Sequence, residues 1–257
     1  MYAEDWTYGR VERELNPNAD ATTRARSLAN LAVSLLAAGR PSRAGAVLND
    51  AVAASRSPGG SMELPELGRA AGIWDAITTP REPTIRLEPP VPGADMSQEG
   101  ARLLDETFTR ARRAVDNGQY DAALESLAAL PVSVRDHSGP GMRLLYGYLL
   151  YRAALLQDRD SRFQDAAEAL ESLVTEELAW ADRHPEVYYL IGRSRFRSGD
   201  FSMSVQAMAR FIELARNPIH GEHEMPSVHR DIEEPAETSA PVTDAPGESP
   251  KDTAAHP

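Results

Sequence analysis

Apolar residues recur every three to four positions through most of the chain between Asp20 and Arg216. No long stretch alternates apolar with polar residues, which would be the pattern of a half-buried strand. Helix-forming residues dominate the composition, with 39 alanines and an aromatic content of only 6%. The pattern therefore predicts an all-α fold.

The predicted helices are bounded by residues that begin or end helices. Serine and aspartate cap helix N-termini, proline is tolerated in the first turn, and glycine ends helices at turns. Such residues are Asp20 and Ser97 as N-caps, Pro41, Pro140 and Pro185 in first turns, and Gly39, Gly118 and Gly199 at turns. Because several loops between helices are short, neighbouring helices should pack antiparallel as hairpins.

Two segments differ from the rest in composition. Residues 57–100 contain seven prolines, and apolar residues at helical spacing predict one helix there, from about Pro65 to Thr78. The stretch TPREPTIRLEPPVPG that follows should be extended, since a residue before proline is disfavoured in the α region. Residues 217–257 hold seven prolines, nine acids and two bases, with few large apolar residues, which predicts a disordered acidic tail.

A pattern recurs around four of the predicted turns. In each case a small residue on the first helix and a small residue on the second are 12 positions apart, which suits antiparallel helices about 8–10 Å apart. The pairs are Ala32 and Ala44, Ala111 and Ala123, Ala154 and Ala166, and Gly192 and Ser204. The clearest copy reads YYLIGRSRFRSGDFSMSVQAMARFIELARNP, and an earlier copy reads LANLAVSLLAAGRPSRAGAVLNDAVAAS.

This pattern resembles the tetratricopeptide repeat (TPR), whose first helix carries an aromatic residue, a Leu-Gly pair and a second aromatic, and whose second helix carries a small residue and a large one. Tyr188, Ile191 and Gly192 take the first-helix positions of the clearest copy. Arg195 and Arg110 depart from the pattern, since the family has an aromatic residue and Leu there. The resemblance covers roughly residues 20–216 with interruptions, and it implies an α-solenoid of antiparallel helical hairpins.

The first two copies begin 79 residues apart, about two repeat lengths, so the helix behind Pro65 is interpreted as the remnant of a degenerate repeat. An ordinary irregular helical bundle is the alternative, since Ala and Leu at helical spacing occur in any α protein. The repeat interpretation divides the chain into N-terminal helices with a first hairpin (1–56), a Pro-rich connection with one helix (57–100), further hairpins (101–216) and the tail (217–257).

Charge and composition narrow the classes of partner. The formal net charge of −12 repels phosphate backbones and acidic lipid surfaces, so we expect no nucleic acid as partner. No apolar stretch approaches the roughly 20 residues of a membrane-spanning helix, and we expect no membrane insertion. Of the 27 basic residues only Lys251 is not Arg, a bias typical of GC-rich bacterial genes. Without an apolar signal segment near Met1 a cytoplasmic protein is expected, or a periplasmic one if a signal peptide was removed.

The sequence offers little catalytic chemistry. It contains no cysteine, phosphate-binding glycine loop, helical HExxH or nucleophile elbow. His137 and His184 are interpreted as capping or solvated residues, and the irregularly spaced histidines His220, His223 and His229 are not expected to hold a metal. We therefore expect a non-catalytic protein with no cofactor.

The remaining candidate site is the face of the first helices, which lines a concave surface in tetratricopeptide-like arrays. Mapping that face onto this sequence yields mostly aromatic and Arg side chains, the types enriched at interface hot spots. The predicted partner-binding residues are Phe108, Arg112, Tyr148, Tyr151, Tyr189, Arg193, Phe196 and Arg197. Packing between repeats is the equally weighted alternative for the aromatic residues, whereas Arg193 and Arg197 are expected to be exposed because burial of an unpaired guanidinium is costly.

The predicted function is a protein–protein interaction adaptor or assembly subunit that binds a protein or peptide partner through this face. A regulatory or sensor module of a larger signalling or transcription system is the alternative. The acidic tail is interpreted first as a segment that only keeps the protein soluble. The alternative is a tail that attracts the Arg residues of the face weakly and competes with the partner.

Overall fold

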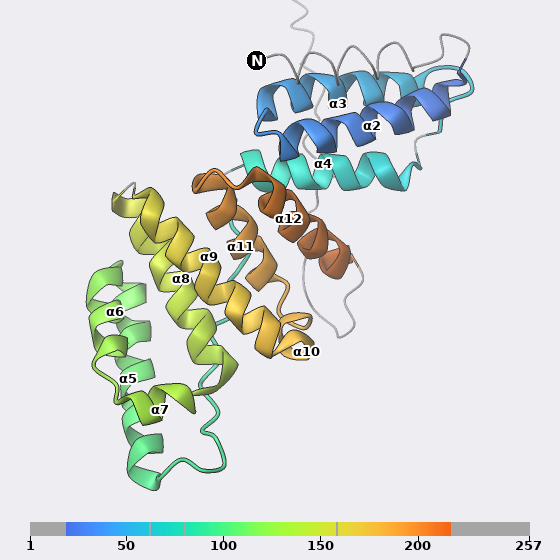
Figure 1. The fold of residues 1–257 in the computed structure, drawn as a ribbon. Coiled ribbons are helices and arrows are strands. Elements are labelled where there is room, and N and C mark those ends of the chain that lie inside the picture. Colours follow the sequence, from blue (N-terminus) through green and yellow to red (C-terminus); the bar gives the residue numbers. More distant parts are fainter. Residues whose placement is uncertain (1–18, 62, 80, 158, 217–257) are drawn as a thin grey trace, which may run out of the picture. The chain divides into compact units, whose positions relative to one another are not determined.

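The structure is a computed structural model that describes residues 19–61, 63–79, 81–157 and 159–216. Its described residues form eleven helices and no strand (Figure 1), which confirms the all-α prediction. The helices are α2 (Ala21–Ala37), α3 (Pro41–Arg56), α4 (Pro65–Thr78), α5 (Gln98–Asp116), α6 (Tyr120–Ala128), α7 (Val132–Asp136), α8 (Gly139–Gln157), α9 (Asp160–Glu176), α10 (Leu178–Ala181), α11 (Glu186–Arg197) and α12 (Phe201–Arg216). The predicted acidic tail, with the alternative that it competes with a partner, lies outside the described residues.

The helix boundaries follow the capping residues of the sequence. The Asp20 carboxylate accepts a hydrogen bond from the Thr23 amide at 2.8 Å, and the Ser97 hydroxyl accepts one from the Gly100 amide at 3.1 Å. The predicted helix from Pro65 to Thr78 is confirmed as α4. Pro185 stands at the N-cap of α11, one position before the first turn in which it was predicted.

Four helical hairpins form where the small-residue pairs predict them. Helix α2 packs against α3, α5 against α6, α8 against α9, and α11 against α12. All eight small residues of the pairs are buried. At Gly192 a Cβ atom would lie only 2.8 Å from Cγ of Met208, so this hairpin needs glycine for its helices to approach.

The hairpins do not pack in their order along the chain. The α5/α6 hairpin contacts α8, and the α8/α9 hairpin contacts α11, as sequential stacking requires. The next contacts of α12, however, are with α2 and α4, near the beginning of the chain (Figure 1). The first hairpin of the sequence therefore packs beside the last one. One core cluster accordingly contains buried residues of α2, α3 and α4 together with residues of α8, α9, α11 and α12.

Glycines on α4 allow α12 to approach. A Cβ atom at Gly72 would lie 3.2 Å from Cδ1 of Ile212, and one at Gly68 would lie 3.2 Å from the Arg216 guanidinium. The Arg216 guanidinium also donates a hydrogen bond to the carbonyl of Gly68. On another side of α4, the Trp74 indole N–H donates to the carbonyl of Pro41 at 3.1 Å, which attaches α4 to α3.

These contacts show how α4, interpreted as the remnant of a degenerate repeat in the 79-residue gap, packs in the fold. Helix α4 has no second helix of its own in that gap, because the described residues from Arg81 to Gly93 are not helical. It packs instead as a third helix on α2 and α3 and joins them to α12. The predicted segments 1–56 and 101–216 thus share a core. Within the described ranges no helix is long and apolar enough to cross a membrane.

The close approach of α8 and α9 is tested by overpacking. Ala154 is fully buried, so Ala154→Leu should lower the free energy of unfolding by about 1–3 kcal/mol, measured by urea denaturation. Ala122 is exposed on α6, and Ala122→Leu should change the free energy of unfolding by less than about 0.5 kcal/mol. Equal stabilities of the two variants would contradict the packing of this hairpin.

The contact between α4 and α12 is tested at Gly72. In an uncovered helix, Gly72→Ala and Gly72→Leu would both stabilise by roughly 0.5–1 kcal/mol through helix propensity. Against Ile212, Ala should be near neutral and Leu should destabilise by about 1–3 kcal/mol, measured by the same denaturation. Stabilisation by Leu would place α12 elsewhere.

Candidate peptide-binding face

An extended segment of the chain itself crosses the face that the sequence predicts for partner binding. We call residues 81–93 the strap and the strap-facing side of α5, α8 and α11 the first-helix face. The strap lies between α4 and α5 in the chain. Helix α4 packs beside α12, whereas the α5/α6 hairpin packs on the α8/α9 hairpin, which in turn packs on α11. The strap therefore has to pass along the intervening hairpin helices.

The carboxylate of Glu82 anchors the strap to α8. One oxygen accepts a hydrogen bond from the Tyr151 hydroxyl at 3.1 Å, and the other accepts one from the Arg152 guanidinium at 2.9 Å. The Arg152 guanidinium carbon lies 5.1 Å from the ring centroid of Tyr120 and 6.0 Å from that of Tyr148. Arg152 is thus held by cation–π contacts in a position that suits a carboxylate on an extended segment.

Helix α11 holds backbone carbonyls where α4 ends and the strap begins. The Tyr189 hydroxyl donates to the carbonyl of Arg81 at 3.0 Å. The Arg193 guanidinium donates to the carbonyl of Ile77 in the last turn of α4. The last carbonyls of a helix have no intrahelical partner, so a guanidinium there both satisfies them and complements the helix dipole.

The side chains of the strap alternate between the helices and solvent. Ile85 and Leu87 are partly buried and pack against the two main core clusters, whereas Thr84, Arg86 and Glu88 are exposed. A period of two is the pattern of an extended chain with one buried side.

Two glycines at the start of α8 let the strap backbone approach closely. A Cβ atom at Gly139 would lie 3.2 Å from the carbonyl oxygen of Val91, and one at Gly141 would lie 3.3 Å from that of Glu88. Gly139 has a φ of 73°, which also favours glycine. At the end of the strap, the amide of Gly93 donates to the carbonyl of His137 at 3.1 Å.

Several predicted partner-binding residues are therefore buried or already engaged. The exposed fractions of Tyr151, Tyr189 and Phe108 are 0%, 1% and 3%, so the packing alternative holds for these rings. The expected exposure of Arg193 is wrong, because Arg193 is half-buried and bonds to backbone carbonyls.

The other predicted residues divide between half-buried and exposed. Tyr148 is half-buried beside Arg152. Phe196 packs partly buried, with its ring centroid 5.3 Å from that of Phe201. Arg197 is exposed, as expected, with its guanidinium carbon 5.1 Å from the ring centroid of Phe163.

The first-helix face remains open at α5. A cavity of about 340 Å³ lies there, between helix α5 and Pro89 of the strap, and the exposed Arg112 lines it beside the edge of Phe108. Its remaining lining residues are Asp105, Thr109, Arg113 and Asp116. Of the eight predicted residues, Phe108 and Arg112 are the two that this cavity brings together.

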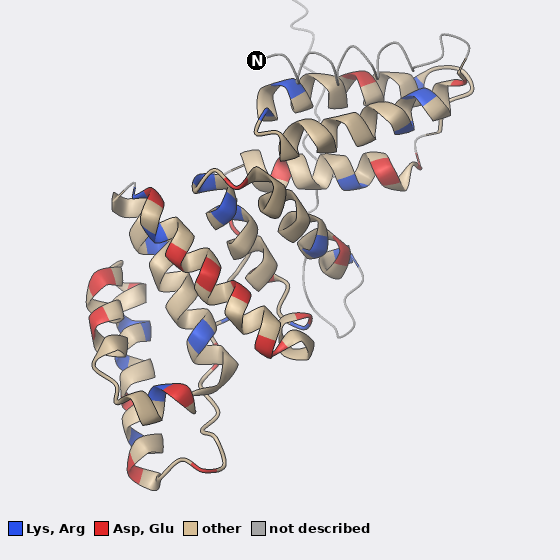
Figure 2. Ribbon diagram, viewed as in Figure 1, with Lys and Arg blue, Asp and Glu red and all other residues tan. Residues whose placement is uncertain are grey.

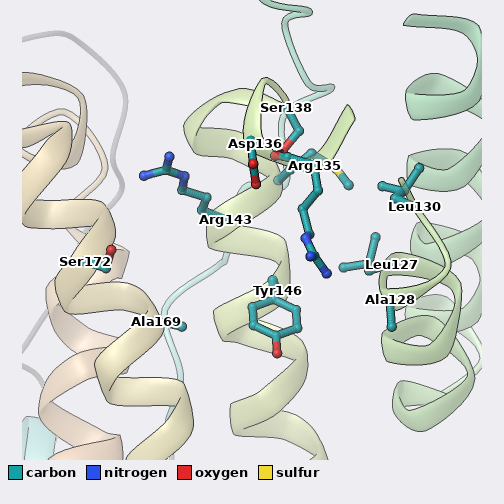
Figure 3. A pocket seen from close by; sticks show the side chains of 11 residues that line it. Leu127, Ala128, Leu130, Arg135, Asp136, Ser138, Arg143, Tyr146, Ala169 and Ser172 are labelled. Atoms are coloured by element: carbon teal, nitrogen blue, oxygen red, sulfur yellow. Dashed lines mark hydrogen bonds between the residues drawn. The ribbon is translucent and has the colours of Figure 1, made fainter. Parts of the chain in front are cut away.

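A second cavity, of about 370 Å³, is lined by residues of α6, α7, α8 and α9. Figure 3 shows Arg135 of α7 extending toward Leu127 and Tyr146. Tyr146 is 42% exposed, and Arg143 is ion-paired with Glu176 of α9. The sequence analysis missed this cavity, since nothing in the spacing of α8 distinguishes Tyr146 from the buried tyrosines of the same helix.

Burial keeps the tyrosine hydroxyls of the face protonated to higher pH. Loss of solvent raises the pKa of Tyr151 to about 12 and also raises the pKa values of Tyr148 and Tyr189. The shift changes the protonation of these hydroxyls only in the alkaline range, since a tyrosine with its ordinary pKa near 10 is already protonated at neutral pH.

His184 differs from its prediction as a capping or solvated residue. Its side chain is only 13% exposed and stacks on Trp180 with ring centroids 3.8 Å apart. Its Nε2 lies 3.9 Å from a carboxylate oxygen of Glu88 on the strap. In the part of the chain that the structure describes, no group of three or more acidic or histidine side chains could hold a metal ion.

Comparisons with known proteins do not identify a family for this chain. No protein-family model, no curated protein and no solved structure matches it.

The raised pKa of Tyr151 makes stability depend on pH in the alkaline range. The folded state favours the neutral phenol, so this contribution is complete below the unfolded pKa near 10 and is lost as pH rises through about 12. Tyr151→Phe should make the decline in the free energy of unfolding between pH 10 and 12 less steep, as measured by urea denaturation at each pH. The variant of exposed Tyr146, Tyr146→Phe, should follow the wild-type profile.

Proposed function

We propose that this chain is a non-catalytic, tetratricopeptide-like α-solenoid that acts as an adaptor or assembly subunit and binds an extended segment of a protein partner on its first-helix face. The observation that carries the proposal is the strap, an extended segment already seated on that face. The four hairpins with buried small residues at the predicted 12-residue spacing support the tetratricopeptide-like part.

The chemistry of the face suits a polypeptide. It presents phenol hydroxyls and guanidinium groups, which donate hydrogen bonds to backbone carbonyls and carboxylates. Aromatic and Arg side chains are also the residue types that dominate interface energetics. The same donors that bind the carbonyl of Arg81 and the carboxylate of Glu82 are able to bind equivalent groups of another chain.

A partner has access to this face at α5. The open cavity lined by Arg112 adjoins the strap at Pro89, so a partner segment that begins in the cavity would extend directly onto the strap path. Helix α9 carries the exposed acidic residues Asp165 and Glu168. Figure 2 shows acidic positions along this helix. The cavity carries two guanidinium groups, Arg112 and Arg113, beside two carboxylates, Asp105 and Asp116, so a partner segment there would need side chains of both charges.

Site-specific photo-crosslinking in the native host tests the proposal. Benzoyl-phenylalanine in place of Arg112, in the full chain, should crosslink one protein reproducibly, because the cavity is part of the partner's site. The same probe in place of Gln164, an exposed residue of α9, should not crosslink that protein.

Two outcomes contradict the proposed function. One is that both positions crosslink the same background proteins. The other is that the Arg112 position crosslinks only the chain itself. Light scattering on the purified material separates the two forms of the proposal, since a free adaptor has the mass of one chain and a permanent subunit co-purifies with its partner.

A further inference from the structure

The strap is held as a bound peptide is held, by its side chains and by isolated polar contacts. Its anchoring polar groups are the carbonyl of Arg81, the carboxylate of Glu82 and the amide of Gly93. From Glu82 to Pro92, no strap amide bonds to another backbone group within the described residues. The strap is therefore not part of a helix or sheet that would have to unfold before it could leave.

The strap side chains that contact the helices form a short pattern. The carboxylate of Glu82 lies on Tyr151 and Arg152, and the apolar side chains of Ile85 and Leu87 lie on the core clusters at positions +3 and +5. Thr84 and Arg86 between them are exposed, whereas Pro83 is partly buried. The specificity of the seat thus resides in one acidic and two aliphatic side chains at fixed spacing on an extended backbone.

The ion pair between Glu82 and Arg152 is partly exposed to solvent. In the ion pair, the side chain of Arg152 is 30% exposed and that of Glu82 is 22% exposed. Ion pairs that water reaches contribute little to stability. The Nε of Arg152 is buried without a hydrogen-bond partner among the described residues, so Glu82 does not use the whole donor set. The contact is specific in geometry but limited in strength.

Covalent attachment at both ends raises the local concentration of the strap. A tethered segment behaves as a ligand at roughly millimolar concentration, so modest contacts suffice to keep it seated. A second peptide with the same pattern can bind only those chains whose face is open. Its apparent dissociation constant is therefore its intrinsic dissociation constant divided by the fraction of open chains.

We propose that the strap is a cis-acting competitor, which occupies the first-helix face until an extended partner segment with an acidic residue followed at +3 and +5 by aliphatic residues replaces it. This inference rests on the proposed function and adds the chemical class of the partner and the means by which access is controlled. The alternatives are a strap that never leaves and a strap exchanged with a second copy of this chain.

The test is binding of a fluorescent peptide with the strap sequence REPTIRLEPPVPG to the full chain, followed by fluorescence polarisation. The loosened variant Glu82→Ala/Ile85→Ser should bind this peptide about tenfold more tightly than the wild-type chain, the factor expected if the strap is seated in about nine chains of ten. Glu82→Gln alone, the milder variant, should give a smaller change in the same direction. Val91→Ser is the matched control, because the Val91 side chain is 77% exposed on the same strap, and it should bind as the wild-type chain does.

Two further variants test where the peptide binds. In the loosened background, Arg152→Met should weaken peptide binding by about tenfold, and a peptide carrying Glu82→Gln should lose a similar factor from the same contact. Far-UV circular dichroism and thermal melts establish that each variant remains folded under the binding conditions.

The outcomes that would overturn the inference are specific. Equal affinity of the folded loosened and wild-type chains, or no binding by either loosened variant, makes the strap a permanent structural element. A doubled mass of the loosened variant in light scattering assigns the strap to exchange between two copies. Arg112 is accessible while the strap lies on the face, so crosslinking of a partner at Arg112 does not require the strap to leave. If a partner crosslinks there but the strap peptide does not bind, this inference is wrong and the proposed function stands. Peptide binding without partner crosslinking removes the proposed function instead.

Discussion

The packing of α12 against α4 is the contact on which the arrangement of this protein depends. Two glycines on α4 admit Ile212 and Arg216 of α12, and this brings the first hairpin beside the last one. The hairpins contact one another in the order α11/α12, α8/α9 and α5/α6. The chain must therefore pass from α4, beside α12, along the α8/α9 hairpin before it begins α5. The 19 residues from Thr79 to Ser97 make this connection. The proline-rich composition of the strap suits an extended connection.

The strap in turn satisfies the hydroxyls of two buried aromatic residues of the first helices. The rings of Tyr151 and Tyr189 pack edge-on against Phe163 and Phe211, and the strap provides an acceptor for each hydroxyl. Buried hydroxyls need hydrogen-bond partners, and the strap supplies them through a carboxylate and a backbone carbonyl. The side chains that the sequence predicts for partner binding are thus, in this region, partly engaged within their own chain.

The sequence predicts local structure well where local chemistry decides it. Asp20 and Ser97 cap their helices, Pro65 begins α4, and the small pairs such as Ala154 and Ala166 mark the hairpins, because capping and close approach depend on residues near each other in sequence.

The order of the hairpins and the seat of the strap could not be predicted in the same way. The contact of Gly72 with Ile212 joins residues far apart in sequence, and nothing in the spacing of α4 distinguishes packing on α12 from packing within a degenerate repeat. The candidate site was predicted in part for the same reason. Its residue types and its helices were identified, but Glu82 and Arg152 were missed because their pairing depends on the path of the strap. The alternation of Ile85 and Leu87 with polar residues was the one local signal that the segment has a buried side.

The reordered packing also has a consequence for synthesis on the ribosome. The first hairpin and α4 leave the exit tunnel early, but the α12 residues that cover the glycine side of α4 are synthesised last, with Arg216 and Gly68 separated by 148 positions. Until then α4 carries an uncovered apolar side, and the core that it shares with α11 and α12 cannot close. Folding of a chain with such distant contacts is slower than that of a sequentially stacked repeat protein, in which each hairpin packs on the one made just before it. The nascent chain thus depends on α12, the last helix of the described residues, to cover one side of α4.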